Sequence, residues 1–263
     1  MDLNLTGKVF LVAASSKGLG FAIAEALARE GAFVSMGSRS ESAITQAAHQ
    51  LSAKYGVKTH GFVLDASSSP SIEQWTQNSL EMFGRIDGLV VNAGGPEQGM
   101  FDNLTDESWT EAFELSLMSA IRMIRNVLPT MKNQGSGSIL TLTSSSIREP
   151  IDVLVLSNVF RSGVLSLVKS LSVDLASYGI RINNLVPGQI ATDRMQANDV
   201  FTAEKRGVDL AKHITARQAA IPMGRYGLPE EFASAAAFLL SEAASYITGT
   251  SLIVDGGKLK GVV

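Results

Sequence analysis

The sequence predicts a doubly wound α/β fold, in which helices cover both faces of a seven-stranded parallel sheet. Short apolar runs alternate with longer segments of helical spacing, and a glycine-rich turn follows the first run. Strand and helix repeated about six times is typical of parallel sheets. No linker rich in proline, glycine or serine divides the 263 residues. We therefore expect a single domain over residues 1–263.

The strand candidates are apolar runs of four to seven residues. Their length and their valine and isoleucine content are typical of strands buried on both faces. In chain order they are residues 9–13, 33–36, 61–64, 88–91, 138–142, 180–186 and 251–254.

The helix candidates are longer segments with apolar residues at helical spacing. They are residues 22–28, 43–51, 72–83, 109–131, 154–175 and 230–240. Residues 97–106 and 198–218 fit neither pattern and are expected to be irregular insertions. Such insertions after strand ends lie where ligands bind in open α/β sheets. We expect a substrate lid around residues 193–222; a surface helix without ligand contact is the alternative.

The composition excludes several classes of protein. With 45% hydrophobic and 18% charged residues, the chain is not disordered. Its 22 basic and 25 acidic residues show no basic excess, which argues against a nucleic-acid partner. Cysteine is absent and the three histidines are scattered, so we expect no disulfide and no metal site. No apolar run approaches the roughly 18 residues of a membrane span, and no secretion signal is visible. A cytoplasmic protein without a membrane partner is expected.

The turn from Ala14 to Gly20 joins the first strand to the first helix. Glycines there let the backbone approach a pyrophosphate, and the helix N-terminus offers free N–H groups to the anion. The turn predicts a dinucleotide site. On glycine spacing alone, an ordinary strand-to-helix turn remains the alternative.

The residues after the second strand bear on the choice of cofactor. A carboxylate about 20 residues beyond the glycines would bind the ribose 2′-OH and favour NAD. Here Arg39 occupies this region and no acid occurs until Glu41. Arg39 and Lys17 would hold a 2′-phosphate by charge-assisted hydrogen bonds. We therefore favour NADP(H) over NAD(H); solvated surface charges are the alternative interpretation.

Together these features resemble the short-chain dehydrogenase/reductase family, and the resemblance covers residues 7–257. Six family motifs occur in the family's order. They are the T-G-x-x-x-G-x-G loop at residues 13–20, the acid after strand three at Asp65, N-N-A-G at residues 91–94, P-G-x-I-x-T at residues 187–192, Y-I-T-G at residues 246–249 and V-D-G-G at residues 254–257.

The resemblance implies a Rossmann fold and a bound nicotinamide cofactor. In relatives the acid at the position of Asp65 accepts a bond from the adenine amino group, and the P-G-x-I-x-T segment meets the nicotinamide carboxamide. The cofactor-binding residues implied are Ala14, Ser16, Lys17, Gly18, Leu19, Gly20, Arg39, Asp65, Ala66, Asn92, Ala93, Gly94, Arg161, Pro187, Gly188, Ile190 and Thr192.

Within the family, the chain resembles the β-ketoacyl-carrier-protein-reductase-like branch, and in it a divergent subgroup. That subgroup carries L-T-S near strand five and L-S-N-x-x-R afterwards, which stand here at residues 142–144 and 156–161.

The family's catalytic tetrad of Asn, Ser, Tyr and Lys is altered in this sequence. Ser144 matches the family serine; the tyrosine position thirteen residues later is Ser157, and the lysine position is Arg161. The asparagine position falls at Ser116. An aliphatic hydroxyl is a far weaker acid than a phenol, so Ser157 substitutes poorly in proton transfer. Arg161 keeps a positive charge able to hold ribose hydroxyls.

No tyrosine occupies the positions from which relatives recruit one, namely residue 154 and the loop at 145–150. Glu149 would act as a general acid if burial raised its pKa; a loop ion pair or a solvent-facing carboxylate is the alternative. In the glycine loop, Ala13 and Ala14 replace Thr and Gly, which we expect to cost little if the backbone φ is negative.

The resemblance implies an NADP(H)-dependent oxidoreductase of carbonyls or alcohols, similar to 3-oxoacyl reductases, in which water or a substrate group supplies the proton. The alternative is an NADP(H)-binding protein without redox turnover, acting as a sensor or structural subunit. In relatives the helices at 109–131 and 154–178 form a four-helix dimer interface, and the last strand contributes to tetramer contacts. The resemblance therefore implies a homodimer or homotetramer.

Overall fold

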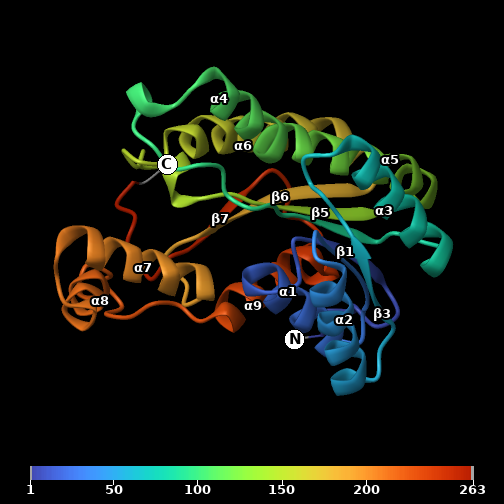
Figure 1. Cartoon of the computed structure of the whole chain (residues 1–263). Helices are drawn as coiled ribbons and strands as arrows, with labels where there is room; N and C mark the ends of the chain where they lie inside the picture. The colour runs from blue at the N-terminus through green and yellow to red at the C-terminus, as the bar shows by residue number, and fades with distance from the viewer. Residues whose placement is uncertain (1, 262–263) are drawn as a thin grey trace.

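The computed structural model describes residues 2–261 and contains a seven-stranded parallel sheet in the order β3-β2-β1-β4-β5-β6-β7 (Figure 1). This confirms the predicted fold class. The strands are β1 Val9–Ala13, β2 Phe33–Ser38, β3 Thr59–Val63, β4 Gly88–Val91, β5 Gly137–Leu142, β6 Ile180–Pro187 and β7 Ser251–Val254. Each lies within two residues of a predicted strand. The chain reverses its direction of travel across the sheet between β1 and β4, and open α/β sheets bind ligands at such a switch point.

Helices cover both faces of the sheet (Figure 1). One face carries α1 Gly18–Arg29, α2 Glu41–Tyr55 and α9 Pro229–Leu240; the other carries α3 Ser69–Phe83, α5 Ser119–Gln134 and α6 Val155–Ala176. In Figure 1, α4 Asp106–Ala112 lies above the sheet with α5 and α6, while α7 Asp193–Arg206 and α8 Leu210–Ala219 stand apart from both layers at the left.

The central strands are apolar without alternation because each face has its own hydrophobic core. In β1, Phe10 and Val12 pack in the cluster that contains α1, α2 and α9. Val9, Leu11 and Ala13 pack in the cluster that contains α3, α5 and α6. Successive strand residues point to opposite faces, so a strand buried on both sides needs apolar residues throughout. The edge strands β3 and β7 are partly exposed, and burial on both faces was a wrong prediction for these two.

Two helix predictions differ from the structure. The predicted helix 109–131 is α4, one π-helical stretch at Phe113–Met118, and α5 in direct succession. The segment 198–218, expected to be irregular, belongs to α7 and α8. Their first turns are capped by side chains, since Thr192 accepts from Met195 N at 3.3 Å and Asp209 accepts from Lys212 N at 3.0 Å. Polar residues dominate α7, which hides its helical period in the sequence.

The turn after β1 is tight and contains a left-handed alanine. Ala14 has φ +49°, so the condition under which we expected this alanine to cost little is not met. The carbonyl oxygen of Ala14 lies so close to Gly20 that a Cβ on Gly20 would collide with it. This close approach packs the start of α1 against the end of β1.

Ala14→Gly is expected to raise the free energy of unfolding by about 1 kcal/mol, because glycine adopts left-handed backbone without the steric penalty of alanine. The midpoint of thermal unfolding, followed by circular dichroism, should rise by roughly 2–4 °C. Ala13→Gly is the control: Ala13 is buried and has no positive φ, so this variant should be less stable than the parent. A lower midpoint for Ala14→Gly would contradict the strain.

Candidate active site

A groove runs across the carboxyl ends of the strands and consists of two cavities that share Ala93. The first, of about 800 Å³, lies at the ends of β1, β2 and β3 and is lined by Lys17, Arg39 and Asp65. The second, of about 610 Å³, lies at the ends of β5 and β6 and is lined by Ser144, Ser157 and Arg161.

Most residues expected to bind a cofactor line one of these cavities. Ala14, Ser16, Lys17, Arg39, Asp65, Ala66, Ala93 and Gly94 line the first, and Leu19, Asn92, Ala93, Arg161, Pro187, Gly188, Ile190 and Thr192 line the second. Gly18 and Gly20 line neither, but they shape the turn between β1 and α1, where Gly18 has φ +63°. Asn92 Nδ2 donates to the Ala14 carbonyl at 3.4 Å and so connects the β4 end to this turn.

The N-terminus of α1 is free to bind an anion. No side chain caps it, and its first turn contains no acid. The uncapped N–H groups and the helix dipole favour negative charge at this position. The exposed Lys17 stands directly before the helix and adds a cation beside it.

The first cavity also contains polar groups at its far end. Asp65 Oδ1 accepts from Ser67 Oγ at 2.7 Å and from Ser67 N at 3.0 Å. These bonds, with a smaller contribution from the charge of Arg39, hold the pKa of Asp65 below its ordinary value. Ser38, at the end of β2, has a buried hydroxyl without a hydrogen-bond partner in the part of the chain that the structure describes. The sequence prediction missed Ser38, although it directly precedes Arg39.

Ser157 and Arg161 lie one turn apart on α6 and are hydrogen-bonded to each other. Arg161 Nε donates to Ser157 Oγ at 3.1 Å. Arg161 Nη1 also donates to the carbonyls of Leu142 at 2.9 Å and Thr143 at 3.3 Å, at the end of β5. Ser144 follows immediately, and its Oγ accepts from Ser146 N at 3.2 Å. The structure thus brings three of the four candidate catalytic residues into one cavity.

The Arg161 side chain has no carboxylate partner among the described residues. Burial, and secondarily the neighbouring charge of Arg194, lowers the pKa of Arg161 to about 10. The guanidinium therefore stays protonated at neutral pH, but its positive charge is poorly compensated. Such a group makes stronger hydrogen bonds than it would in water.

Ser116, the fourth candidate, does not line the cavity of Ser144 and Ser157. It belongs to the π-helical stretch Phe113–Met118, and its buried hydroxyl has no hydrogen-bond partner among residues 2–261. It lines a separate cavity of about 20 Å³, together with Asn92 and Arg161. A polar space of this size is sufficient for one water molecule.

Comparison with known proteins places these features in one family. Residues 13–258 match the family model described as Enoyl-(Acyl carrier protein) reductase. The 3-oxoacyl-acyl-carrier-protein reductase of Haemophilus influenzae is 35% identical over 255 residues, covering 96% of this chain and 98% of its own. The chain belongs to the short-chain dehydrogenase/reductase family. It is an oxidoreductase of the class acting on CH–OH and C=O groups, as the reductases and dehydrogenases named among its relatives support.

Solved structures of this family share the fold over the full chain. L-sorbose reductase from Gluconobacter frateurii, complexed with NADPH and L-sorbose, has 31% identity and a TM-score of 0.95, with 100% of both chains covered. An NADPH-bound short chain oxidoreductase from Pseudomonas aeruginosa, described as containing an atypical catalytic centre, has 28% identity and a TM-score of 0.89. The match covers 98% of this chain and 99% of that one.

None of the four tyrosines lines the cavity of Ser144 and Ser157 in the described part of this dehydrogenase/reductase chain. Tyr226 donates its hydroxyl to Asp199 Oδ2 at 3.0 Å, and Tyr178 and Tyr246 are exposed. Glu149 does line the cavity, but it is exposed and accepts from Lys260 N at 3.2 Å. The burial on which the general-acid hypothesis for Glu149 depended is therefore not found.

The sequence prediction missed a group of polar side chains at this cavity. Arg194, Arg217, Lys258 and Gln189 all line it. The guanidinium of Arg194 lies directly against Gly95, where any Cβ would collide with it. Only the position of Gln189 inside the P-G-x-I-x-T segment could have indicated a contact with ligand, because the others lie on segments without a motif.

Asp199 holds α7 and α8 together. It is 1% exposed, and its carboxylate pairs with Arg217 on α8 and accepts from Tyr226. His213 Nε2 on α8 lies 3.4 Å from Asp199 Oδ1. A buried carboxylate with several partners fixes the relative position of the elements that supply them.

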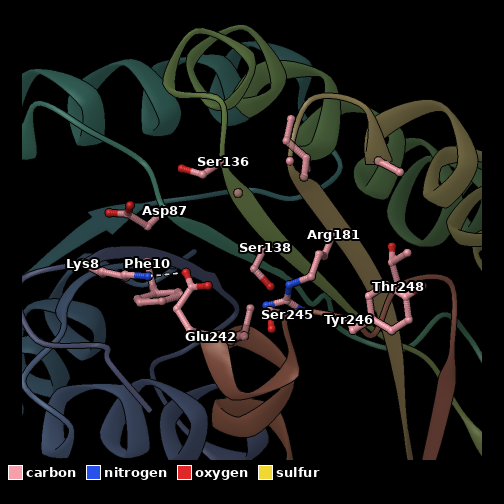
Figure 2. A pocket seen from close by; sticks show the side chains of 15 residues that line it. Lys8, Phe10, Asp87, Ser136, Ser138, Arg181, Glu242, Ser245, Tyr246 and Thr248 are labelled. Atoms are coloured by element: carbon pink, nitrogen blue, oxygen red, sulfur yellow. Dashed lines mark hydrogen bonds and ion pairs between the residues drawn. The ribbon is translucent and has the colours of Figure 1, made fainter. Parts of the chain in front are cut away.

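Another cavity, of about 510 Å³, lies at the opposite edge of the sheet, near the starts of β1, β5 and β6 (Figure 2). Its charged side chains are already paired. Lys8 Nζ lies 2.6 Å from Glu242 Oε1, and Arg181 donates to the carbonyls of Leu239 and Ser241, each at 2.8 Å. This leaves little polar capacity for a reaction at that edge.

Within residues 2–261, no group of three or more His, Asp or Glu side chains is arranged to hold a metal ion. The same residues contain no helix with the length and apolar character needed to cross a membrane.

Asp199→Asn is expected to loosen α7 and α8, since it leaves Arg217 without its charge partner. Proteolytic cleavage within residues 193–222, located by mass spectrometry, should become roughly tenfold faster. Glu204→Gln, which removes the same charge from an exposed position on α7, is the control and should be cleaved like the parent. Equal cleavage rates for the two variants would show that Asp199 does not anchor the segment.

Proposed function

We propose that the protein is an NADP(H)-dependent reductase that interconverts a carbonyl and an alcohol, similar to 3-oxoacyl reductases, with an atypical proton relay. The observation that carries this proposal is the Arg161–Ser157 hydrogen bond in the same cavity as Ser144. That cavity shares its lining residue Ala93 with the cavity lined by Lys17 and Arg39. The NADPH-bound relatives support the same cofactor.

The residues present fit a phosphorylated dinucleotide. The uncapped start of α1 would bind its pyrophosphate. Lys17 and Arg39 would hold the 2′-phosphate, and the unpartnered hydroxyl of Ser38 is available beside them. Asp65 would receive the adenine amino group, and the segment 187–192 would meet the nicotinamide end. When bound, the cofactor supplies the hydride.

Ser144 and Ser157 would bind the substrate oxygen. Because Arg161 donates to Ser157 Oγ, the hydroxyl hydrogen of Ser157 is free to point toward a carbonyl. An aliphatic hydroxyl does not give up its proton outright at neutral pH. We therefore propose that Ser157 passes its proton to the substrate oxygen while receiving one from a water molecule, which regains a proton from the solvent. Ser116 and the small cavity beside Arg161 would hold a water near this pair.

We further propose that residues 193–222 form the substrate lid, since α7 and α8 supply Arg194 and Arg217 to the cavity. Exposed apolar side chains on α6 and the neighbouring π-helical stretch support pairing of this face with a second copy of the chain; they include Phe113, Val159 and Val173. We therefore propose that the protein forms a homodimer or homotetramer, which sedimentation velocity can measure. We also propose that it is located in the cytoplasm.

Arg39→Ala is expected to lower kcat/KM with NADPH by roughly 10- to 100-fold while leaving kcat/KM with NADH nearly unchanged, because only NADPH carries the 2′-phosphate. The assay follows the absorbance of the reduced cofactor with ketones, β-ketoacyl thioesters and quinones. Arg29→Ala, at the far end of α1, is the matched control. An equal loss for both cofactors would refute the role of Arg39.

Ser144→Ala should reduce kcat by roughly 10²- to 10³-fold, as the loss of one donor to a developing oxyanion does. Cofactor affinity, measured by calorimetry, should stay the same.

Glu149→Gln distinguishes proton donation through the serines from proton donation by the Glu149 carboxylate. We expect this variant to retain turnover, and a loss of turnover would assign the role of general acid to Glu149. Cofactor binding without turnover of any substrate would instead support the sensor or subunit hypothesis.

A further inference from the structure

The cavity of Ser144 and Ser157 contains more positive than negative charge. Arg161, Arg194, Arg217 and Lys258 line it, against the carboxylates of Glu149 and Asp255. Asp255 is occupied by backbone groups: its Oδ1 accepts from Gly257 N at 2.8 Å, and its Oδ2 accepts from Leu259 N at 2.7 Å. Glu149 is likewise bound to the backbone of Lys260. These carboxylates form no ion pair with the cations of the cavity.

Two of the cations converge on one neutral oxygen. With the Gln189 amide oriented to satisfy its neighbours, its side-chain oxygen accepts from Lys258 Nζ at 2.7 Å and from Arg217 Nη2 at 2.7 Å. The three side chains come from separate parts of the chain: the β6–α7 connection, α8 and the segment after β7. Asp199 neutralises Arg217 through Nη1, and Lys258 has no carboxylate within ion-pair distance among the described residues.

The positive charge of Lys258 is therefore poorly stabilised by its surroundings. Burial, followed by repulsion from Arg217, lowers the pKa of Lys258, and the attraction of Glu149 and Asp255 offsets this only in part. A neutral amide oxygen accepts both hydrogen bonds but does not cancel the charge. A carboxylate at the same point would do both.

The phosphates of a dinucleotide do not explain these cations. The groups suited to them, the α1 N-terminus with Lys17 and Arg39, lie at the other cavity. Arg217 and Lys258 line only the cavity of Ser144 and Ser157. Arg194 lies against Gly95 between the two cavities, and we therefore do not assign it to the substrate.

We propose that the substrate is an oxo acid whose carboxylate binds Arg217 and Lys258 beside Gln189 while its carbonyl reaches Ser144 and Ser157. The inference rests on the proposed reductase function and narrows it to one substrate class. One ammonium and one guanidinium that is already paired with Asp199 suit a singly charged carboxylate better than a doubly charged phosphate.

The first test compares 2-, 3- and 4-oxopentanoate with their methyl esters in NADPH oxidation. For the best acid, kcat/KM should exceed that of its ester by roughly 10- to 100-fold. Lys258→Met should bring this ratio close to 1. Lys260→Met removes a nearby exposed cation that does not line the cavity, and it should leave the ratio unchanged. Equal turnover of acids and esters by the parent would overturn the inference while leaving the reductase function intact.

Gln189→Glu provides a second, opposite variant, because it places a carboxylate of the protein where the substrate's would bind. This variant should lose the preference for acids over esters and unfold at a higher temperature than the parent. A lower unfolding temperature together with an undiminished preference would show that the two cations do not form the anion site.

Binding measured without turnover separates this inference from the proposed function. In calorimetry with NADP⁺ present, pentanoate should bind and methyl pentanoate should not, and Lys258→Met should abolish the binding of pentanoate. If pentanoate binds in this way but no carbonyl compound is reduced, the anion site stands and the reductase function fails. If inorganic phosphate binds more tightly than pentanoate, the assignment to a carboxylate is wrong.

Discussion

The cavity of Ser144 and Ser157 depends on one buried cation. Arg161 fastens α6 to the end of β5 through two backbone carbonyls and gives a third hydrogen bond to Ser157. Among residues 2–261 no carboxylate pairs with it, and its hydrogen bonds there go to neutral oxygens. That arrangement costs stability by desolvation. In return, it fixes Ser157 in position and leaves the hydroxyl hydrogen of Ser157 free to donate.

Around this cation, the two cavities at the carboxyl edge of the sheet differ in the polar groups that line them. At β1, β2 and β3 the polar groups suit phosphates and an adenine: a helix N-terminus, two exposed cations and a carboxylate held by Ser67. At β5 and β6 they suit a small reacting molecule: two hydroxyls and the cations that meet at Gln189. At the opposite edge Lys8 is paired with Glu242 (Figure 2), and Arg181 donates to the carbonyls of Leu239 and Ser241. The chemistry therefore concentrates where the strands end, as expected for an open parallel sheet.

The sequence predicted the sheet well because each strand is a short apolar run followed by an amphipathic segment. Spacing from Ser144 also placed Ser157 and Arg161 correctly in one cavity, since a separation of four on a helix puts two side chains on the same face. Ser116 was assigned from the resemblance alone; it lies in the π-helical stretch Phe113–Met118 and lines the small cavity beside Arg161, not the cavity of Ser144. Periodicity failed for α7, whose polar residues conceal the helical period. The cations of the cavity come from distant segments, and only the tertiary fold brings Arg217 and Lys258 to the same oxygen.

The guanidinium of Arg217 makes two contacts that are not independent of each other. One nitrogen of its guanidinium holds the buried carboxylate of Asp199 on α7, and another faces Gln189 and the neighbouring ammonium group. A ligand that binds the second nitrogen therefore also acts on the Arg217–Asp199 contact between α8 and α7. The charge of a bound ligand and the positions of α7 and α8 are therefore coupled through the single guanidinium group of Arg217.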